Sequence, residues 1–198
     1  NIINNTNYTM LVSGSYPSNT KHYSKDIDIL IVKHKHLKDN IGSGDLKNII
    51  KKIKIYFEEL NKDKENNKEN NLEIISLGSK KFMGLIKSPI SNKMRHIDIR
   101  LVIINDLPYT YLYYSSGKIF NKIIREKFKK KGYKLNEYGL YKIRDNKGFE
   151  KIKFDEEMNL NLDNIKNREI NLLNYIKKIE EEIFKLASMD YKTVQERY

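Results

Sequence analysis

Hydrophobic and polar residues alternate in two segments of the chain, and both segments carry acidic residues. Residues 26–32 alternate aspartate with isoleucine at their start and are rich in β-branched side chains, which predicts a β-strand. Residues 96–104 repeat this pattern, and shorter apolar runs at 72–77 and 81–86 predict two further strands. Together these segments predict a β-sheet in the first half of the chain.

Other segments space their apolar residues as a helix does. Asp45 is a suitable N-cap residue, and apolar residues follow it at helical spacing to Leu60. A basic helix is predicted from about residue 119 to 131, where Gly132 stands in the usual C′ position. One or two short strands at 133–143 and a helix at about 164–182 complete the prediction.

The residue pattern changes at residues 105–108, which contain a proline and follow the last strong strand. We therefore predict two domains, 1–105 and 106–198. The order of elements predicts an α+β fold. The first domain is expected to be a mixed β-sheet with helices on one face, and the second a smaller α+β domain. The polar run at 61–71 is expected to be an exposed loop.

Composition narrows the possible functions. The chain has 198 residues and no cysteine, which excludes disulfides, thiolate metal sites and cysteine nucleophiles. It contains neither a run of 18 apolar residues nor a visible signal peptide, so no membrane partner is expected. The net charge is +12, and residues 106–150 hold 11 basic and five acidic residues. This local excess favours contact with a phosphate backbone, the alternative being a solvated lysine-rich helix face.

Three carboxylates are the strongest candidates for chemistry. Asp26 and Asp28 are two residues apart on a predicted strand, so their side chains share one face, and Asp98 shares a face with Arg100 on another strand. If the strands are neighbours, the three carboxylates converge. Such a group repels itself unless Mg²⁺ or Mn²⁺ neutralises it, and two such ions support phosphoryl or nucleotidyl transfer. The alternative is that this Asp-x-Asp motif lies on a solvated sheet face.

A Gly-Ser dipeptide, Gly14-Ser15, follows an apolar segment about ten residues before Asp26. A turn of this kind at the end of a strand can present backbone N–H groups and a hydroxyl to a phosphate. Alone the dipeptide is uninformative. Followed at this distance by Asp-x-Asp on a strand, it is the arrangement of nucleotidyltransferases.

Several short motifs occur in a particular order along the chain. They are Gly14-Ser15-Tyr16, Lys25-Asp26-Ile27-Asp28, Lys81-Phe82-Met83-Gly84, Arg95-His96-Ile97-Asp98, Ile119-Phe120-Asn121-Lys122, Lys131-Gly132-Tyr133 and Asn136-Glu137-Tyr138. With the C-terminal tail from Met189 to Arg197, they resemble the palm and thumb of DNA polymerase family X, the group that includes DNA polymerase beta. The resemblance implies a nucleotidyltransferase-type palm followed by a small α+β thumb. Residues 149–178 depart from it.

The resemblance also implies a role for individual residues. The catalytic and metal-binding residues are Asp26, Asp28 and Asp98. The nucleotide-binding residues are Gly14, Ser15, Ser24, Lys25, Tyr113, Tyr114, Gly117 and Asn121. The DNA-binding residues are His96, Arg100, Lys122, Arg125 and Tyr138, with Arg100 also supporting Asp98. Two departures stand out: Pro17-Ser18 replaces a common arginine, and Ser116-Gly117 reverses a common Gly-Ser.

The implied activity is that of a Mg²⁺-dependent DNA-directed DNA polymerase. It adds dNTPs to a primer 3′ end with two Mg²⁺ ions, for which Mn²⁺ can substitute, and fills short gaps in DNA repair. The expected partners are gapped or primer–template DNA and dNTPs, and the chain is expected to be a monomer or part of a longer chain. The expected location is intracellular, nuclear or cytoplasmic, with a viral source left open. The alternatives are a template-independent nucleotidyltransferase similar to poly(A) polymerase, and an inert DNA-binding module.

Overall fold

The computed structural model describes residues 8–18, 26–34, 41–42, 44–60, 71–88, 91, 93–146, 148–154 and 165–198. Its contacts divide the chain into two units. The first unit comprises the described residues within 1–12 and 23–103, and the second those within 13–22 and 104–198. Each unit combines a sheet with helices, so the predicted α+β fold is confirmed. No helix in the described ranges is long and apolar enough to span a membrane.

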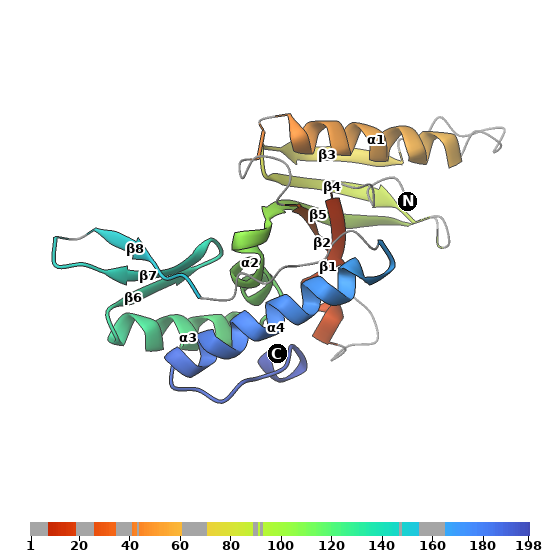
Figure 1. Cartoon of the computed structure of the whole chain (residues 1–198). Coiled ribbons are helices and arrows are strands. Elements are labelled where there is room, and N and C mark those ends of the chain that lie inside the picture. The colour runs from red at the N-terminus through yellow and green to blue at the C-terminus, as the bar shows by residue number, and fades with distance from the viewer. Residues whose placement is uncertain are drawn as a thin grey trace. The chain divides into compact units, whose positions relative to one another are not determined.

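The first unit is built on a five-stranded sheet with the strand order β1-β2-β5-β4-β3 (Figure 1). Its strands are β1 (Tyr8–Val12), β2 (Asp26–Lys33), β3 (Leu72–Leu77), β4 (Lys81–Lys87) and β5 (Met94–Ile103). Strand β2 pairs with β5 in parallel, and every other pairing in the sheet is antiparallel. This one parallel pairing brings together the two strands that carry the predicted carboxylates.

Helix α1 (Asp45–Leu60) and the five-stranded sheet together form the hydrophobic core of the first unit. Its buried residues recur at the predicted helical spacing, and they pack with apolar side chains from one face of the sheet. The helix contributes Leu46, Ile49, Ile50 and Ile53, and the sheet contributes Ile31, Leu72, Phe82, Ile86, Ile97, Ile99 and Leu101. On β2 the expected apolar alternation holds only in part, because Ile27 is 39% exposed.

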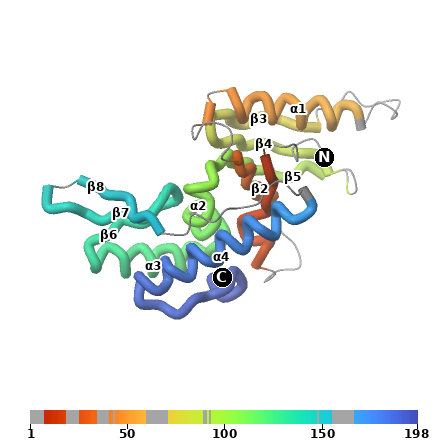
Figure 2. Tube along the Cα trace, in the orientation of Figure 1, coloured from red at the N-terminus to blue at the C-terminus, as the bar shows by residue number. Residues whose placement is uncertain are grey.

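The second unit contains three helices and a small sheet (Figure 2). Its helices are α2 (Leu107–Tyr114), α3 (Lys118–Lys130) and α4 (Arg168–Leu186). The antiparallel sheet consists of β6 (Tyr133–Asn136), β7 (Gly139–Ile143) and β8 (Phe149–Lys151). Four short 3₁₀ segments also belong to this unit: η1 (Tyr16–Ser18), η2 (Ile104–Asp106), η3 (Ile165–Asn167) and η4 (Gln195–Arg197).

Several features of the second unit differ from the prediction, among them strand β8, which was not expected. The tyrosine-rich segment before α3 is a helix, α2, and all of its residues from Leu107 to Leu112 are buried. A helix that is buried on every side has no polar face, so its sequence lacks helical periodicity. The last helix also begins and ends four residues later than expected, at Arg168 and Leu186. The predicted strands and the basic helix ending before Gly132 are confirmed.

Candidate active site

The acidic residues of the first unit lie on neighbouring strands in matching register. In the parallel pairing, Asp28 stands directly beside Asp98, and Asp26 stands beside His96. Residues opposite one another on paired strands point to the same face, and neighbouring strands are about 4.8 Å apart. Asp26 and Asp28 also share that face, which we call the acidic face. Asp26 is exposed, and Asp28 and Asp98 are half-buried. Two strands far apart in sequence therefore bring the three carboxylates to one face of the sheet.

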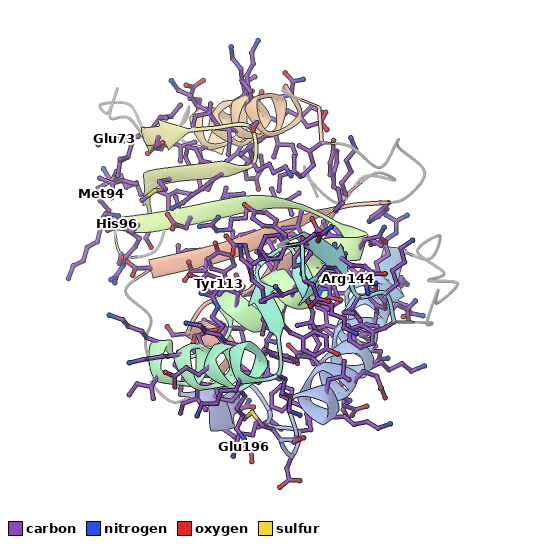
Figure 3. The ribbon with its side chains drawn as sticks, turned by 90° about the vertical axis from the view of Figure 1, so that its left-hand side faces the viewer. Glu73, Met94, His96, Tyr113, Arg144 and Glu196 are labelled. Atoms are coloured by element: carbon purple, nitrogen blue, oxygen red, sulfur yellow. The ribbon has the colours of Figure 1, made fainter. Side chains whose placement is uncertain are left out.

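Basic side chains border the acidic face where β5 pairs with β4, on the side of β5 away from β2. Strand β4 pairs with β5 so that Lys81 lies opposite Arg100. The Lys81 Nζ atom is 3.7 Å from Asp98 Oδ2. Lys81 belongs to one of the sequence motifs, but no role was predicted for it, because its place beside Asp98 follows from the antiparallel register of β4. Figure 3 labels His96 and Met94, near the start of β5.

The neighbouring carboxylates act electrostatically on Asp28. Partial burial raises the pKa of Asp28, and the negative charges of Asp98 and Asp26 raise it further. Arg100 and Lys81 act in the opposite direction but do not cancel the rise. The acidic face is therefore a place where negative charge is costly and a cation is favoured.

The donor set on the acidic face fits a hard divalent cation, since carboxylate oxygens are the ligands that Mg²⁺ and Mn²⁺ prefer. Over the described ranges, however, no group of three or more His, Cys, Asp or Glu side chains is arranged to hold a metal ion. The backbone register brings the carboxylates to one face, but the side chains do not form a closed set of ligands.

The predicted phosphate-binding turn, residues 13–18, belongs to the second unit. We call it the Gly-Ser turn. Gly14 has φ of 71°, a left-handed conformation that glycine adopts without strain. The buried Ser18 closes the turn, with its N–H and Oγ both donating to the Ser15 carbonyl oxygen, at 3.2 and 2.6 Å. Ser15 itself is exposed. The two other predicted triphosphate residues, Ser24 and Lys25, lie outside the described residues.

The predicted nucleotide-sugar residues, Tyr113 and Tyr114, are the last two residues of α2; we call residues 113–117, which include them and the connection to α3, the aromatic turn. The rings of Tyr113 and Tyr114 meet edge to face with centroids 4.7 Å apart. The Asn121 side-chain amide donates to the carbonyl oxygens of Tyr113 at 2.9 Å and Ser116 at 3.0 Å. Asn121, which the resemblance places against the incoming base, therefore also ties this turn to α3.

The remaining predicted DNA-binding residues are divided between the units. His96 and Arg100 lie on β5, where His96 is exposed and Arg100 is half-buried. Lys122 and Tyr138 are exposed in the second unit. The Arg125 guanidinium is stacked 4.5 Å from the centre of the Tyr113 ring, and its Nη2 atom is 4.0 Å from Glu137. Within the second unit, Arg125 thus connects the aromatic turn to the β6–β7 connection.

Comparison with known families decides the identity of both parts. A family model described as DNA polymerase beta palm matches residues 2–103, and one described as DNA polymerase beta thumb matches residues 110–198. The chain belongs to DNA polymerase family X. The predicted resemblance is confirmed, and the chain is a family X polymerase-like protein with a palm and a thumb. A comparison with curated proteins finds no match.

The two family matches assign the candidate site residues to a palm and a thumb region. The acidic face is carried by the matched palm region, and the aromatic turn with Asn121 and Arg125 is carried by the matched thumb region. The Gly-Ser turn falls in the palm match by sequence, whereas its contacts in the structure are with the second unit. Sequence spacing alone had no signal for these contacts.

Proposed function

We propose that this family X protein is a DNA-directed DNA polymerase that adds dNTPs to a primer 3′ end. The observation that carries the proposal is the parallel pairing of β2 with β5, which sets Asp28 directly beside Asp98 with Asp26 on the same face. Its occurrence in a chain matched by palm and thumb models favours templated synthesis over other nucleotidyl transfer. Short-gap filling in DNA repair, in the nucleus or the cytoplasm, is the proposed task.

In this proposal Asp26 and Asp28 would hold two Mg²⁺ ions, and Asp98 would bind one of them and orient the primer 3′-hydroxyl. When bound, the ions would supply charge neutralisation at the triphosphate and activation of the hydroxyl, and Mn²⁺ could replace them. The hydroxyl gives up its proton to water, its oxygen attacks the α-phosphorus in line to form a new P–O ester bond, and the bond to pyrophosphate breaks so that pyrophosphate leaves with the electron pair. The role of the protein is therefore positioning and charge, as in other phosphoryl transfers.

The other proposed site residues bind the nucleotide and the DNA. Ser15 and the N–H groups around Gly14 contact the triphosphate, together with Ser24 and Lys25. Tyr113 and Tyr114 lie against the sugar, Gly117 also belongs to the nucleotide-binding residues, and Asn121 reaches the base. The DNA contacts come from His96, Arg100, Lys122, Arg125 and Tyr138. In this arrangement, Arg125 would leave the Tyr113 ring when it engages the template strand.

The test is primer extension on a one-nucleotide gapped duplex, with each of the four dNTPs offered singly and Mg²⁺ present. We expect the wild-type chain to add only the complementary nucleotide. Asp98→Asn should lower turnover by more than about 100-fold with little change in the affinity for DNA, because loss of a metal ligand removes catalysis rather than binding. Glu73→Gln is the matched control, since Glu73 is an exposed carboxylate on β3 of the same sheet.

Each other outcome contradicts a different part of the proposal. Addition of any nucleotide to a single-stranded primer, without regard to the template, would favour the template-independent alternative. Binding of gapped DNA without any extension would favour an inert DNA-binding module. Asp98→Asn turnover within about tenfold of wild type would reject the assignment of the three carboxylates.

A further inference from the structure

We propose that the C-terminal segment, residues 192–198, is a positioning element that holds both the aromatic turn and the Gly-Ser turn for the incoming nucleotide. This inference rests on the proposed function, because it concerns the same nucleotide site. The contacts described below join residues of the second unit.

The segment is anchored by a buried ion pair at its end. Arg197 is 2% exposed, and its Nη1 atom donates to Glu180 of α4 at 2.9 Å, while Nη2 donates to the other carboxylate oxygen. The Arg197 Nε atom donates to the Lys192 carbonyl oxygen at 2.8 Å, which closes the segment on itself. The guanidinium also lies 5.3 Å from the centre of the Phe184 ring. The Arg197 guanidinium is thus engaged by neighbouring groups of the second unit, so its role is to fix the backbone of the C-terminal segment.

The anchored backbone holds the aromatic turn through Gly117. The Gly117 N–H donates to the Arg197 carbonyl oxygen at 3.0 Å. Gly117 has φ of −62° and ψ of 154°, values that any residue can adopt, so its backbone conformation does not require glycine. The requirement is steric, because a Cβ atom at position 117 would lie only 2.8 Å from the Arg197 carbonyl oxygen. The reversed order Ser116-Gly117 therefore permits the close approach of the C-terminal segment.

The same segment also contacts the Gly-Ser turn. The Gln195 side-chain amide donates to the Pro17 carbonyl oxygen at 3.3 Å, and the short helices η1 and η4 pack together. Glu196, labelled in Figure 3, stiffens η4 from within, since its carboxylate accepts bonds from the N–H and hydroxyl of Thr193 at 2.7 and 2.8 Å. One rigid segment thus contacts two turns that are about a hundred residues apart in sequence.

The inference predicts an effect on nucleotide binding that can be measured separately from catalysis and from DNA binding. If the segment positions the two turns, loosening it changes the shape of the nucleotide site and leaves the carboxylates of the first unit and the basic face of α3 unaltered. The Michaelis constant for dNTP should rise, whereas kcat at saturating dNTP and the affinity for gapped DNA should change little. A purely structural role would instead lower the active fraction, which reduces kcat and leaves the Michaelis constant unchanged.

The test is single-nucleotide gap filling by full-length Gln195→Ala and Glu196→Ala, which alter the C-terminal segment and leave the nucleotide-site residues and the buried Arg197–Glu180 pair unchanged. For Gln195→Ala we expect a rise of about twofold in the Michaelis constant for dNTP, because its bond to Pro17 is long and exposed. For Glu196→Ala we expect a rise of about three- to tenfold, because both bonds from Thr193 are lost. The matched control is Glu182→Ala, since Glu182 is an exposed carboxylate of the same unit that pairs locally with Lys185 on α4.

The outcomes separate this inference from the proposed function. A wild-type chain that fails to extend any primer overturns the proposed function and the inference with it. An active wild type with an unchanged Michaelis constant in both Gln195→Ala and Glu196→Ala overturns the inference alone. A lower kcat at constant Michaelis constant, or an equal rise in Glu182→Ala, also overturns it, since either result indicates general loosening of the second unit.

Discussion

Replacing Asp28 by asparagine should stabilise the protein when divalent cations are absent and destabilise it, relative to wild type, when they are present. Asp28 stands directly beside Asp98 in the parallel pairing, and both are half-buried. Two unit charges about 5 Å apart repel by about 3 kcal/mol at an effective dielectric of about 20, and by about 1 kcal/mol in bulk water. Lys81 and Arg100 offset part of this repulsion. The net gain from Asp28→Asn in a chelating buffer is therefore about 1–2 kcal/mol.

This gain has a defined dependence on pH. The pKa of Asp28 is raised in the folded state, chiefly by burial and then by Asp98 and Asp26. The folded protein therefore holds the Asp28 proton more tightly than the unfolded chain does. The penalty is absent below the unfolded pKa near 3.8 and grows as the pH rises through the folded pKa. The advantage of Asp28→Asn over wild type should thus be present at neutral pH and vanish in acid.

Thermal unfolding with and without Mg²⁺ is the assay. For a chain of this size, 1 kcal/mol corresponds to about 2–4 °C in Tm, so Asp28→Asn should melt about 2–8 °C above wild type in EDTA. At a Mg²⁺ concentration of about 100 times its Kd, wild type should gain about 2.7 kcal/mol, or about 5–11 °C, and Asp28→Asn much less. Glu73→Gln should gain as much as wild type. A lower melting temperature for Asp28→Asn in EDTA, or an equal gain from Mg²⁺ in both proteins, would refute the reasoning.

Three further predictions concern other parts of the structure. Neutralising Lys122 and Arg125 on α3 should lower the slope of log K against log salt for DNA binding by about one unit per lost phosphate contact, and an unchanged slope would remove both from the DNA interface. Asp45→Asn should destabilise the protein at neutral pH, and this loss should shrink as the pH falls from 3.8 through the lowered folded pKa, because the 2.7 Å ion pair with Lys33 lowers the pKa of Asp45; chemical denaturation at neutral and at acid pH checks this. Burial raises the pKa of Tyr191 to about 12, so stability should fall between pH 10 and 12 as the unfolded chain ionises first; Tyr191→Phe should show a smaller fall, and identical alkaline curves would contradict the assignment.

The sequence alone was sufficient to predict the helices and strands that follow from local residue patterns. The alternation in β5 follows from one buried and one more open face of the sheet, and it identified that strand. The similar sequence pattern at the start of β2 identified the second strand and the shared face of Asp26 and Asp28, although β2 is buried on both faces beyond Ile29. Helix α1 was predictable because one side packs on the core and the other meets solvent. The family resemblance rested on motifs of this local kind, and both family models bear it out.

Only the tertiary structure decided which of these residues meet. The place of Asp28 beside Asp98 depends on the parallel register of two strands about 70 residues apart, and local spacing carries no information on register. Helix α2 escaped prediction because burial on all sides removes the periodic signal. The pair between Glu180 and Arg197 was equally hidden, since charged residues are ordinarily exposed and only their long-range pairing makes burial tolerable.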